Sequence, residues 1–251
     1  MKLFVVTGAS RGLGAALAGR LLGDAGHTVL GISRRQNAEL AALAQAHGSR
    51  CEQWSADLGE PIGVAARLAD WLAAQGAHAF IEATLVNNAG VLTTIGALEN
   101  CSDAELSAAL RVGLEAPLLL SAAFLRATAE WHGERRVLNI SSGLGRRAMA
   151  GQATYCAAKA GVDHLSRALA LDQALLAHGA KIVSLAPGVI DTDMQMQLRG
   201  ASGAAFPEQA VFLHLKQAGQ LASSDAAAAR ILAFLARPDF GATPVADVRD
   251  A

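Results

Sequence analysis

The chain has 251 residues, of which 52% are hydrophobic and 17% are charged, and its formal net charge is −1 at pH 7. This length and apolar content are enough for one large α/β domain with a sizeable core. The near-zero charge provides no field that would attract nucleic acid or an anionic membrane, so neither is expected as a partner. Cys51, Cys101 and Cys156 are few and widely spaced, which argues against a disulfide framework and against a paired-cysteine metal site.

Short runs rich in β-branched residues alternate along the chain with longer runs rich in alanine and leucine. The expected strands span residues 3–7, 28–33, 50–55, 84–87, 136–140 and 181–186, with a last strand near 244–248. The expected helices span residues 12–25, 36–47, 62–75, 103–131, 154–178 and 224–236. This alternation predicts a doubly wound parallel sheet of about seven strands with helices on both faces. No linker or repeat divides the chain, so residues 1–251 are expected to form a single domain.

Residues 191–220 differ from the rest, because they are rich in Met, Gln, Gly and Ser and contain no expected strand. Long connections in compact domains are usually functional lids or disordered, so we expect a lobe that covers the substrate. No run approaches the roughly 18 apolar residues of a membrane span. The apolar start is too short for a signal peptide and is interrupted by Gly8, so the protein is expected to be cytoplasmic.

A glycine-rich turn joins the first expected strand to the first expected helix. Its glycines allow the backbone to turn tightly and to approach a phosphate closely. The helix that follows presents free N–H groups and the positive end of its dipole to a pyrophosphate. In this strand–turn–helix context the motif predicts a dinucleotide site formed by Gly8, Ser10, Arg11, Gly12, Leu13 and Gly14.

The end of the second expected strand bears on the choice between NAD and NADP. An NAD site usually has Asp or Glu about 20 residues beyond the glycines, where it binds the 2′-hydroxyl of the ribose. Ser33 stands at that place here, and Arg34 follows it. Arginine attracts the 2′-phosphate of NADP, and Arg11 can approach the same phosphate from the glycine-rich turn. We therefore expect NADP(H) as the cofactor.

Tyr155 and Lys159 lie four residues apart in a helical pattern, so their side chains share one face. A phenol has an ordinary pKa of about 10, and a cation within about 4–6 Å lowers it. Lys159 is placed to lower the pKa of Tyr155 in this way. Ser142 follows the strand expected at 136–140, at the end of the sheet where ligands bind, and can hold a carbonyl oxygen next to Tyr155. The expected catalytic set is therefore Ser142, Tyr155 and Lys159.

The order and spacing of these motifs resemble the short-chain dehydrogenase/reductase family over nearly the whole chain. The matching segments are residues 7–14, 57–58 and 87–90, then Ser142 with Tyr155 and Lys159, then residues 187–188 with Thr192. The resemblance implies a Rossmann-type fold and a small-molecule carbonyl substrate. It also implies hydride transfer from the nicotinamide to the carbonyl carbon, with Tyr155 as the proton donor.

The resemblance also implies roles for individual residues around the cofactor. Asp57 would contact the adenine, Thr192 would hold the nicotinamide carboxamide with backbone help from Val189 or Ile190, and Lys159 would bind the nicotinamide ribose. The full set of implied cofactor contacts beyond the glycine-rich turn is Ser33, Arg34, Asp57, Leu58, Asn88, Ala89, Gly90, Tyr155, Lys159, Pro187, Gly188, Val189 and Thr192.

One position departs from the family pattern. The family usually has a catalytic Asn where this chain has Gly113. In the family, the backbone carbonyl of that residue helps to hold a water in the proton relay behind the lysine. Glycine keeps the carbonyl but loses the side-chain amide, so activity is expected with a water in place of the amide.

The C-terminal third resembles the sepiapterin reductase and benzil reductase subgroup, through residues 187–195, 215–221 and 241–250. This resemblance implies a diketone or α-dicarbonyl substrate, which Met194 and Met196 of the lobe would help to enclose. An Asp near the C-terminus anchors the pterin in sepiapterin reductase, and Asp247 matches it approximately. Ordinary packing of the methionines and a solvated carboxylate at Asp247 remain alternative interpretations.

Other functions find less support in the sequence. The histidines show no ligand spacing with a carboxylate, so no metal site is expected, and the serines at 141–142 lack the elbow motif of serine hydrolases. The long helices expected at 103–131 and 154–178 are apolar around much of their surface, which favours a homodimer or homotetramer. Two alternatives remain open: an NAD-dependent alcohol dehydrogenase, and a non-catalytic NADP-binding regulatory protein.

Overall fold

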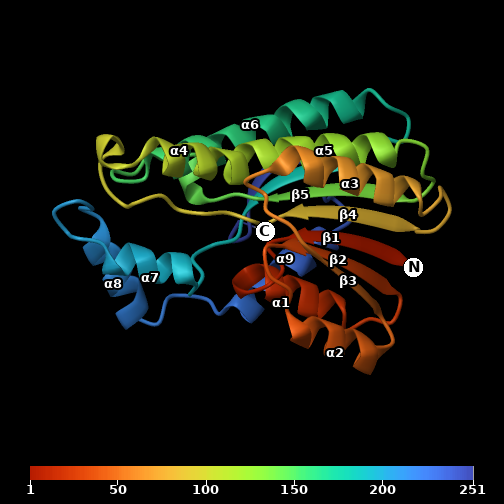
Figure 1. Cartoon of the computed structure of the whole chain (residues 1–251), viewed down its shortest axis with the longest axis horizontal. Coiled ribbons are helices and arrows are strands. Elements are labelled where there is room, and N and C mark those ends of the chain that lie inside the picture. Colours follow the sequence, from red (N-terminus) through yellow and green to blue (C-terminus); the bar gives the residue numbers. More distant parts are fainter. Residues whose placement is uncertain (251) are drawn as a thin grey trace.

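Seven parallel strands form the centre of the computed structural model, which describes residues 1–250 (Figure 1). Their spatial order is β3-β2-β1-β4-β5-β6-β7, so the order of succession reverses between β1 and β4. The predicted doubly wound parallel sheet, a Rossmann-like arrangement, is therefore confirmed. The strands are β1 (Lys2–Thr7), β2 (His27–Ser33), β3 (Arg50–Ser55), β4 (Glu82–Asn87), β5 (Glu134–Ile140), β6 (Lys181–Ala186) and β7 (Val245–Asp247).

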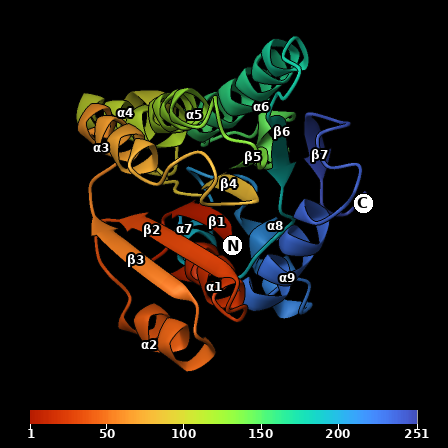
Figure 2. The ribbon, with the colours of Figure 1, turned by 90° about the vertical axis from the view of Figure 1, so that its right-hand side faces the viewer.

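Helices cover both faces of this sheet, as Figure 2 shows. One face is covered by α1 (Gly12–Leu21), α2 (Ala38–His47) and α9 (Ser224–Leu235). The other face is covered by α3 (Pro61–Ala73), α4 (Asp103–Leu110), α5 (Ala116–Ala127) and α6 (Ala153–Ala174). Short 3₁₀ turns lie at Leu98–Asn100 (η1) and Gly143–Gly145 (η3).

β1 illustrates why the strands are continuous apolar runs. Leu3 and Val5 pack into the core shared with α3 and α5, whereas Phe4 and Val6 pack into the core shared with α1 and α9. All four side chains are at most 3% exposed. Helices on both faces of the sheet remove both sets of side chains from water, which is worth about 1.5–3 kcal/mol for each large side chain.

The helix expected over residues 103–131 is interrupted. A π-helical turn, η2 (Arg111–Glu115), separates α4 from α5, and α5 ends at Ala127. Pro117 has no N–H, so the carbonyl of Gly113 lacks its α-helical donor. The backbone here adopts the wider i→i+5 hydrogen-bond pattern of a π-helix. A Cβ on Gly113 would lie only 3.0 Å from the Cβ of Ala158, so glycine allows α6 to approach closely.

By length and composition, the combined helix Asp103–Ala127 is apolar enough to cross a membrane, which corrects the expectation that no run comes close. Core helices that pack inside a domain meet the same criterion. This helix contacts α3 and α6, and 44% of its most apolar window is buried. Packing within the domain therefore accounts for much of its apolar surface.

The segment expected to form a lobe contains two helices, α7 (Asp193–Gly200) and α8 (Gln209–Gln217), beyond the carboxyl ends of the strands (Figure 1). It has a small apolar core of its own, made by Leu198, Phe206 and Phe212. Phe206 is fully buried. This core packs against the partly buried Leu92 and Ile95 from the chain after β4, so the lobe is anchored to the sheet domain.

The first turn of α1 packs directly on the end of β1. A Cβ on Gly14 would lie 2.2 Å from the carbonyl oxygen of Gly8 and 2.6 Å from Nδ2 of Asn88. Gly8 has a φ of +70°, a conformation that glycine adopts without steric cost. These glycines bring the end of β1, the start of α1 and the turn after β4 together.

We predict that Gly14→Ala destabilises the protein by about 1–3 kcal/mol, because the added methyl group meets backbone that cannot move aside easily. Gly63→Ala is the matched control: Gly63 is also the third residue of its helix, and no atom lies within 4 Å of its added Cβ. That control should be neutral or stabilising by up to about 1 kcal/mol. Urea unfolding of both variants measures the difference. Equal free energies of unfolding for the two variants would contradict the close packing of Gly14 on Gly8 and Asn88.

Candidate active site

The turns after β1 and β4 meet where the strand order reverses, which is the usual ligand site of such sheets. The hydroxyl of Thr7, the last residue of β1, accepts hydrogen bonds from the N–H groups of Asn88 (2.9 Å) and Ala89 (3.0 Å). The side-chain amide of Asn88 donates to the Thr7 carbonyl at 2.9 Å. These bonds fix the predicted cofactor residues 88–90 beside the glycine-rich turn.

The start of α1 forms a backbone cradle that suits an anion. The N–H groups of Gly12, Leu13 and Gly14 belong to the first turn and have no intrahelical acceptor. No atom lies within 4 Å of the position that a Cβ on Gly12 would take, so the space above this turn is open. Exposed N–H groups at a helix N-terminus attract phosphate. The cradle therefore fits the pyrophosphate of a dinucleotide.

The residues predicted to contact the adenosine end follow β2 and β3. Ser33 is buried, and its hydroxyl donates to the carbonyl of Arg35 at 2.8 Å. Arg34 is exposed and forms no ion pair within residues 1–250. Asp57 is exposed and accepts the N–H two residues later at 2.8 Å, whereas Leu58 is buried in the core. Arg34 and Asp57 are thus accessible to a ligand.

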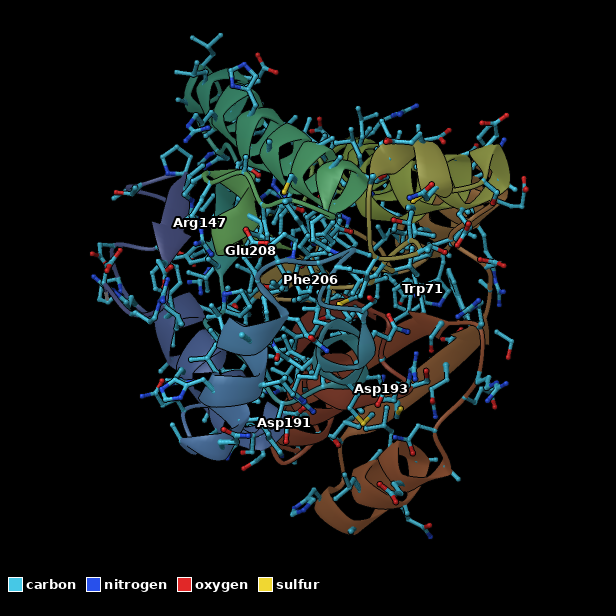
Figure 3. All side chains as sticks on the ribbon, turned by 90° about the vertical axis from the view of Figure 1, so that its left-hand side faces the viewer. Trp71, Arg147, Asp191, Asp193, Phe206 and Glu208 are labelled. Atoms are coloured by element: carbon cyan, nitrogen blue, oxygen red, sulfur yellow. The ribbon has the colours of Figure 1, made fainter. Side chains whose placement is uncertain are left out.

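Arg11 forms a contact that the sequence did not predict. Its guanidinium forms an ion pair with Asp193 at the start of α7, so the glycine-rich turn contacts the lobe. Both side chains are well exposed, at 72% for Arg11 and 48% for Asp193. Figure 3 views the molecule from the lobe side, with Asp193, Asp191, Phe206 and Glu208 in front of the sheet. A surface pair of this kind is worth at most about 1 kcal/mol, so a phosphate can displace Asp193 from Arg11.

The chain leaves β6 through a turn that leads into the lobe. Pro187 is buried, and Gly188 has a φ of +81°. The Val189 carbonyl accepts a hydrogen bond from Ala222 at 3.0 Å, which ties this turn to the start of α9. Thr192 is the residue that precedes α7, and its side chain makes no capping bond to that helix. Its hydroxyl remains available to a ligand.

The predicted catalytic residues come together at the ends of β5 and α6. The ammonium of Lys159 lies 5.6 Å from the centre of the Tyr155 ring and donates to the Ile140 carbonyl at 2.7 Å. Lys159 is 6% exposed, and Tyr155 is half-buried. Ser142 follows β5, and its hydroxyl accepts the N–H of Leu144 at 3.2 Å. The structure thus brings a phenol, an ammonium and a hydroxyl to one place.

The pKa of Tyr155 shifts in the direction opposite to the sequence prediction. Burial raises the pKa of the phenol above its ordinary value, and the side chain of Ser142 works in the other direction. Lys159 does not lower it, because burial lowers the pKa of Lys159 itself to about 8. The ammonium has therefore largely lost its proton at the alkaline pH where the phenol would ionise.

Comparison with known proteins agrees with this geometry. A family model described as short chain dehydrogenase matches residues 2–202. The chain belongs to the short-chain dehydrogenase family. Its relatives include the benzil reductase of Bacillus cereus that forms (S)-benzoin, which is 34% identical over 240 residues, covering 96% of each chain. The sepiapterin reductase of Meriones unguiculatus is 33% identical over 246 residues, covering 94% of this chain and 92% of the relative.

A solved structure supports the same assignment. A protein from Agrobacterium tumefaciens, described as a putative 2-deoxy-D-gluconate 3-dehydrogenase with bound NADP, has a TM-score of 0.79. It is 26% identical and covers 98% of this chain and 94% of its own. The predicted resemblance to the family, with its benzil and sepiapterin reductases, is confirmed.

Met194 and Asp247 are both predicted to contact the substrate of this dehydrogenase, and their surroundings differ from each other. The methyl group of Met194 lies 3.4 Å from the position that a Cβ on Gly90 would take, and Lys159 Nζ lies 4.0 Å from the same position. Met194 therefore reaches from α7 towards the predicted catalytic residue Lys159. Asp247 is only 7% exposed, so it is not a solvated terminal carboxylate. Arg249 binds it through Nε (2.8 Å) and Nη2 (2.6 Å).

The structure also brings two charged residues to the site that the sequence did not single out. Asp163 lies one helical turn beyond Lys159 on α6 and is 1% exposed. Arg146 follows η3 and contacts Asp163 through Nε at 3.3 Å. The two residues are 17 positions apart, so no periodic pattern relates them. Asp163 is thus a buried carboxylate beside the predicted catalytic lysine, and such a charge needs close partners.

We predict that Tyr155 ionises above its ordinary value of 10.0 in the cofactor-free dehydrogenase. Tyr155 is the only tyrosine of the chain, so the ultraviolet absorbance change of phenol ionisation reports this group alone. Ser142→Ala should raise the midpoint further, because the serine side chain lowers the pKa. Lys159→Met should leave it above 10.0, since Lys159 with a pKa of about 8 is already neutral there.

The control for this titration is Tyr155→Phe, which should remove the signal entirely. Circular dichroism at each pH checks that the protein stays folded. A wild-type midpoint at or below 10.0 in folded protein would show that burial does not dominate the pKa of this phenol.

Proposed function

We propose that this short-chain dehydrogenase uses NADPH to reduce a ketone or an α-dicarbonyl compound to an alcohol, with Tyr155 as the proton donor. The observation that carries the proposal is the meeting of Tyr155, Lys159 and Ser142 with an anion-binding backbone cradle at one edge of the sheet. The raised pKa of Tyr155 keeps the phenol protonated at neutral pH, as a proton donor requires.

Several residues of the chain have separate roles in this reduction. NADPH, when bound along the carboxyl ends of β1 and β4, supplies the hydride. The Ser142 hydroxyl holds the carbonyl oxygen of the substrate, and Tyr155 donates its proton to that oxygen. Lys159 binds the ribose hydroxyls. At neutral pH, below its own pKa of about 8, it also carries a positive charge 5.6 Å from the centre of the Tyr155 ring. The carbonyl of Gly113, freed from its helical donor by Pro117, holds a water of the proton relay.

The proposed cofactor contacts follow from where the residues lie. Gly8, Gly12 and the start of α1 hold the pyrophosphate, and Arg34 binds the 2′-phosphate, as does Arg11 once it leaves Asp193. Asp57 and Leu58 lie at the adenine, and Asn88, Ala89 and Gly90 line the adjoining ribose. The turn from Pro187 to Thr192 faces the nicotinamide, with Gly188 and Val189 between them. The Agrobacterium relative with bound NADP supports this choice of cofactor.

The proposed substrate class is that of α-diketones. The benzil reductase relative is named for the reduction of such a compound, and it matches 96% of this chain. The lobe at 191–220 covers the substrate, with Met194 as an adaptable apolar contact. Met196 is 56% exposed and Asp247 is bound by Arg249, so neither is assigned to the substrate.

The apolar outer surface of α4–α6 supports assembly into a homodimer or homotetramer. Leu110 and Leu118 are exposed on α4 and α5, and Leu171 is exposed on α6. Exposed leucines on neighbouring helices favour an interaction surface. The proposed location is the cytoplasm, where a reducing environment suits the free Cys51, Cys101 and Cys156.

We predict that purified protein oxidises NADPH in the presence of benzil or another α-diketone, and that Tyr155→Phe lowers kcat by about 10²–10⁴-fold. The loss arises because phenylalanine keeps the shape of the side chain but has no proton to donate. The Kd for NADPH, measured by fluorescence, should change little. Wild-type turnover in Tyr155→Phe would refute the proton-donor role. Binding of NADPH without turnover of any ketone, diketone or alcohol would favour a regulatory protein.

We also predict that Arg34→Ala reduces the preference for NADPH over NADH by roughly tenfold to a hundredfold, since one charge-assisted hydrogen bond is worth about 1.5–3 kcal/mol. Arg35→Ala is the matched control: it removes an adjacent exposed guanidinium and keeps the carbonyl that Ser33 binds. Kd values for both cofactors test this. A preference for NADH in the wild-type protein would instead favour the NAD-dependent alcohol dehydrogenase.

A further inference from the structure

A buried carboxylate lies directly behind the catalytic lysine. Asp163 is one turn beyond Lys159 on α6 and is 1% exposed. The hydroxyl of Ser184, in β6, donates to its Oδ1 at 2.6 Å, and Arg146 Nε donates to its Oδ2 at 3.3 Å. A buried carboxylate is costly unless its partners are held in place, so this arrangement constrains three elements at once.

The segment that carries Ser142 packs tightly on this carboxylate. A Cβ on Gly145, in η3, would lie 2.6 Å from Asp163 Oδ2 and 3.0 Å from the Lys159 carbonyl. Ser142 is the residue directly before η3, and Arg146 is the residue directly after it. The position of the Ser142 hydroxyl relative to α6 therefore depends on how closely this short turn lies against Asp163.

Arg146 extends the contact to the last strand. Its Nη2 donates to the Ala246 carbonyl at 2.9 Å, and its Nη1 lies 3.9 Å from Asp247 Oδ2. Arg249 in turn binds the Asp247 carboxylate. The guanidinium of Arg146 thus bridges the two buried carboxylates of α6 and β7, while its side chain stays 32% exposed.

We propose that Asp163 is a positioning residue for the reduction: with Arg146, its carboxylate holds the Ser142 turn against the helix that carries Lys159. This inference rests on the proposed function, and it assigns Asp247 to the same network rather than to the substrate. Asp163 acts on chemistry through two neighbours. It fixes where Ser142 lies, and its negative charge stabilises the ammonium of Lys159.

The surroundings of Lys159 make this second effect measurable. The ionisable groups of α6 that face the site are Tyr155, Cys156 and Asp163. Arg146 faces it from η3, and Asp247 and Arg249 lie behind Arg146 at β7 and the C-terminal end. β5 contributes the Ile140 carbonyl. Burial lowers the pKa of Lys159 to about 8 while Asp163 raises it, so removal of the Asp163 charge must lower it further.

The first experiment uses Asp163→Asn, which keeps the size of the side chain and removes its charge. NMR titration of protein labelled with ¹³C-lysine, without cofactor, follows Lys159, which is assigned by Lys159→Met. We expect the midpoint of Lys159 and the alkaline limb of kcat to move to lower pH by about one pH unit. Asp172→Asn, an exposed carboxylate on the same helix, is the control and should leave both in place.

The second experiment tests the position of Ser142. Arg146→Gln should lower kcat by about tenfold with little change in the Kd for NADPH, and Arg146→Lys should recover part of the loss, because lysine keeps the charge but not the fork of donors. Arg50→Gln, at the opposite end of the sheet, is the control. Because Arg146 is partly exposed, its variants test the proposal if Asp163→Asn fails to fold.

Two results would overturn the proposal: an unmoved Lys159 midpoint in folded Asp163→Asn, or wild-type kcat in Arg146→Gln. If the wild-type protein reduces no carbonyl compound, the proposed function fails. The NMR titration would still decide whether Asp163 controls the charge of Lys159, so the two failures are distinguishable.

Discussion

The buried ammonium of Lys159 is the constraint around which the site is built. A charge that is 6% exposed must have close partners, and here they are the Ile140 carbonyl at 2.7 Å and the nearby Asp163. To reach that carbonyl, α6 must lie close to the end of β5. Small residues permit this approach: Gly113 faces Ala158 at the π-helical turn, and Gly145 touches the Lys159 backbone. The π-helical turn and the short turn η3 therefore both help α6 to place the Lys159 ammonium next to β5.

The cofactor half of the site is formed by backbone groups, and the other half is formed by side chains. The cofactor cradle consists of backbone groups at Gly12 and its neighbours, where a side chain would only occupy space. The proposed catalytic half consists of side chains whose pKa values depend on burial and on nearby groups. Within the cofactor half, the hydrogen bonds of Thr7 and Asn88 fix the turns after β1 and β4 to each other. Gly90, in the turn after β4, lies close to Lys159 Nζ, where the two halves meet. Both halves can then be positioned by one rigid sheet edge.

The sequence predicted the strands from their local pattern, and it missed contacts between distant segments. Strands such as β1 are apolar on both faces, so they can be recognised without knowing their neighbours. The π-helical turn was missed, although Pro117 was a local signal for it. The ion pair of Arg11 with Asp193 and the contact of Arg146 with Asp163 join segments whose proximity only the fold creates. The direction of the Tyr155 pKa shift was also wrong, because spacing reveals a neighbouring charge but not the depth of burial.

The lobe shows how such distant contacts bear on the proposed substrate site. Phe206 is fully buried with Leu198 and Phe212, and this cluster packs on the chain after β4. The carboxylate of Asp191 pairs with Arg199 of α7 and Lys216 of α8, which holds the two helices together. A segment with its own core and internal ion pairs keeps its shape without a ligand. Met194 therefore reaches towards Lys159 from a helix that belongs to this packed segment. For the proposed carbonyl substrates, rearrangement of the methionine side chain would cost less than movement of the backbone.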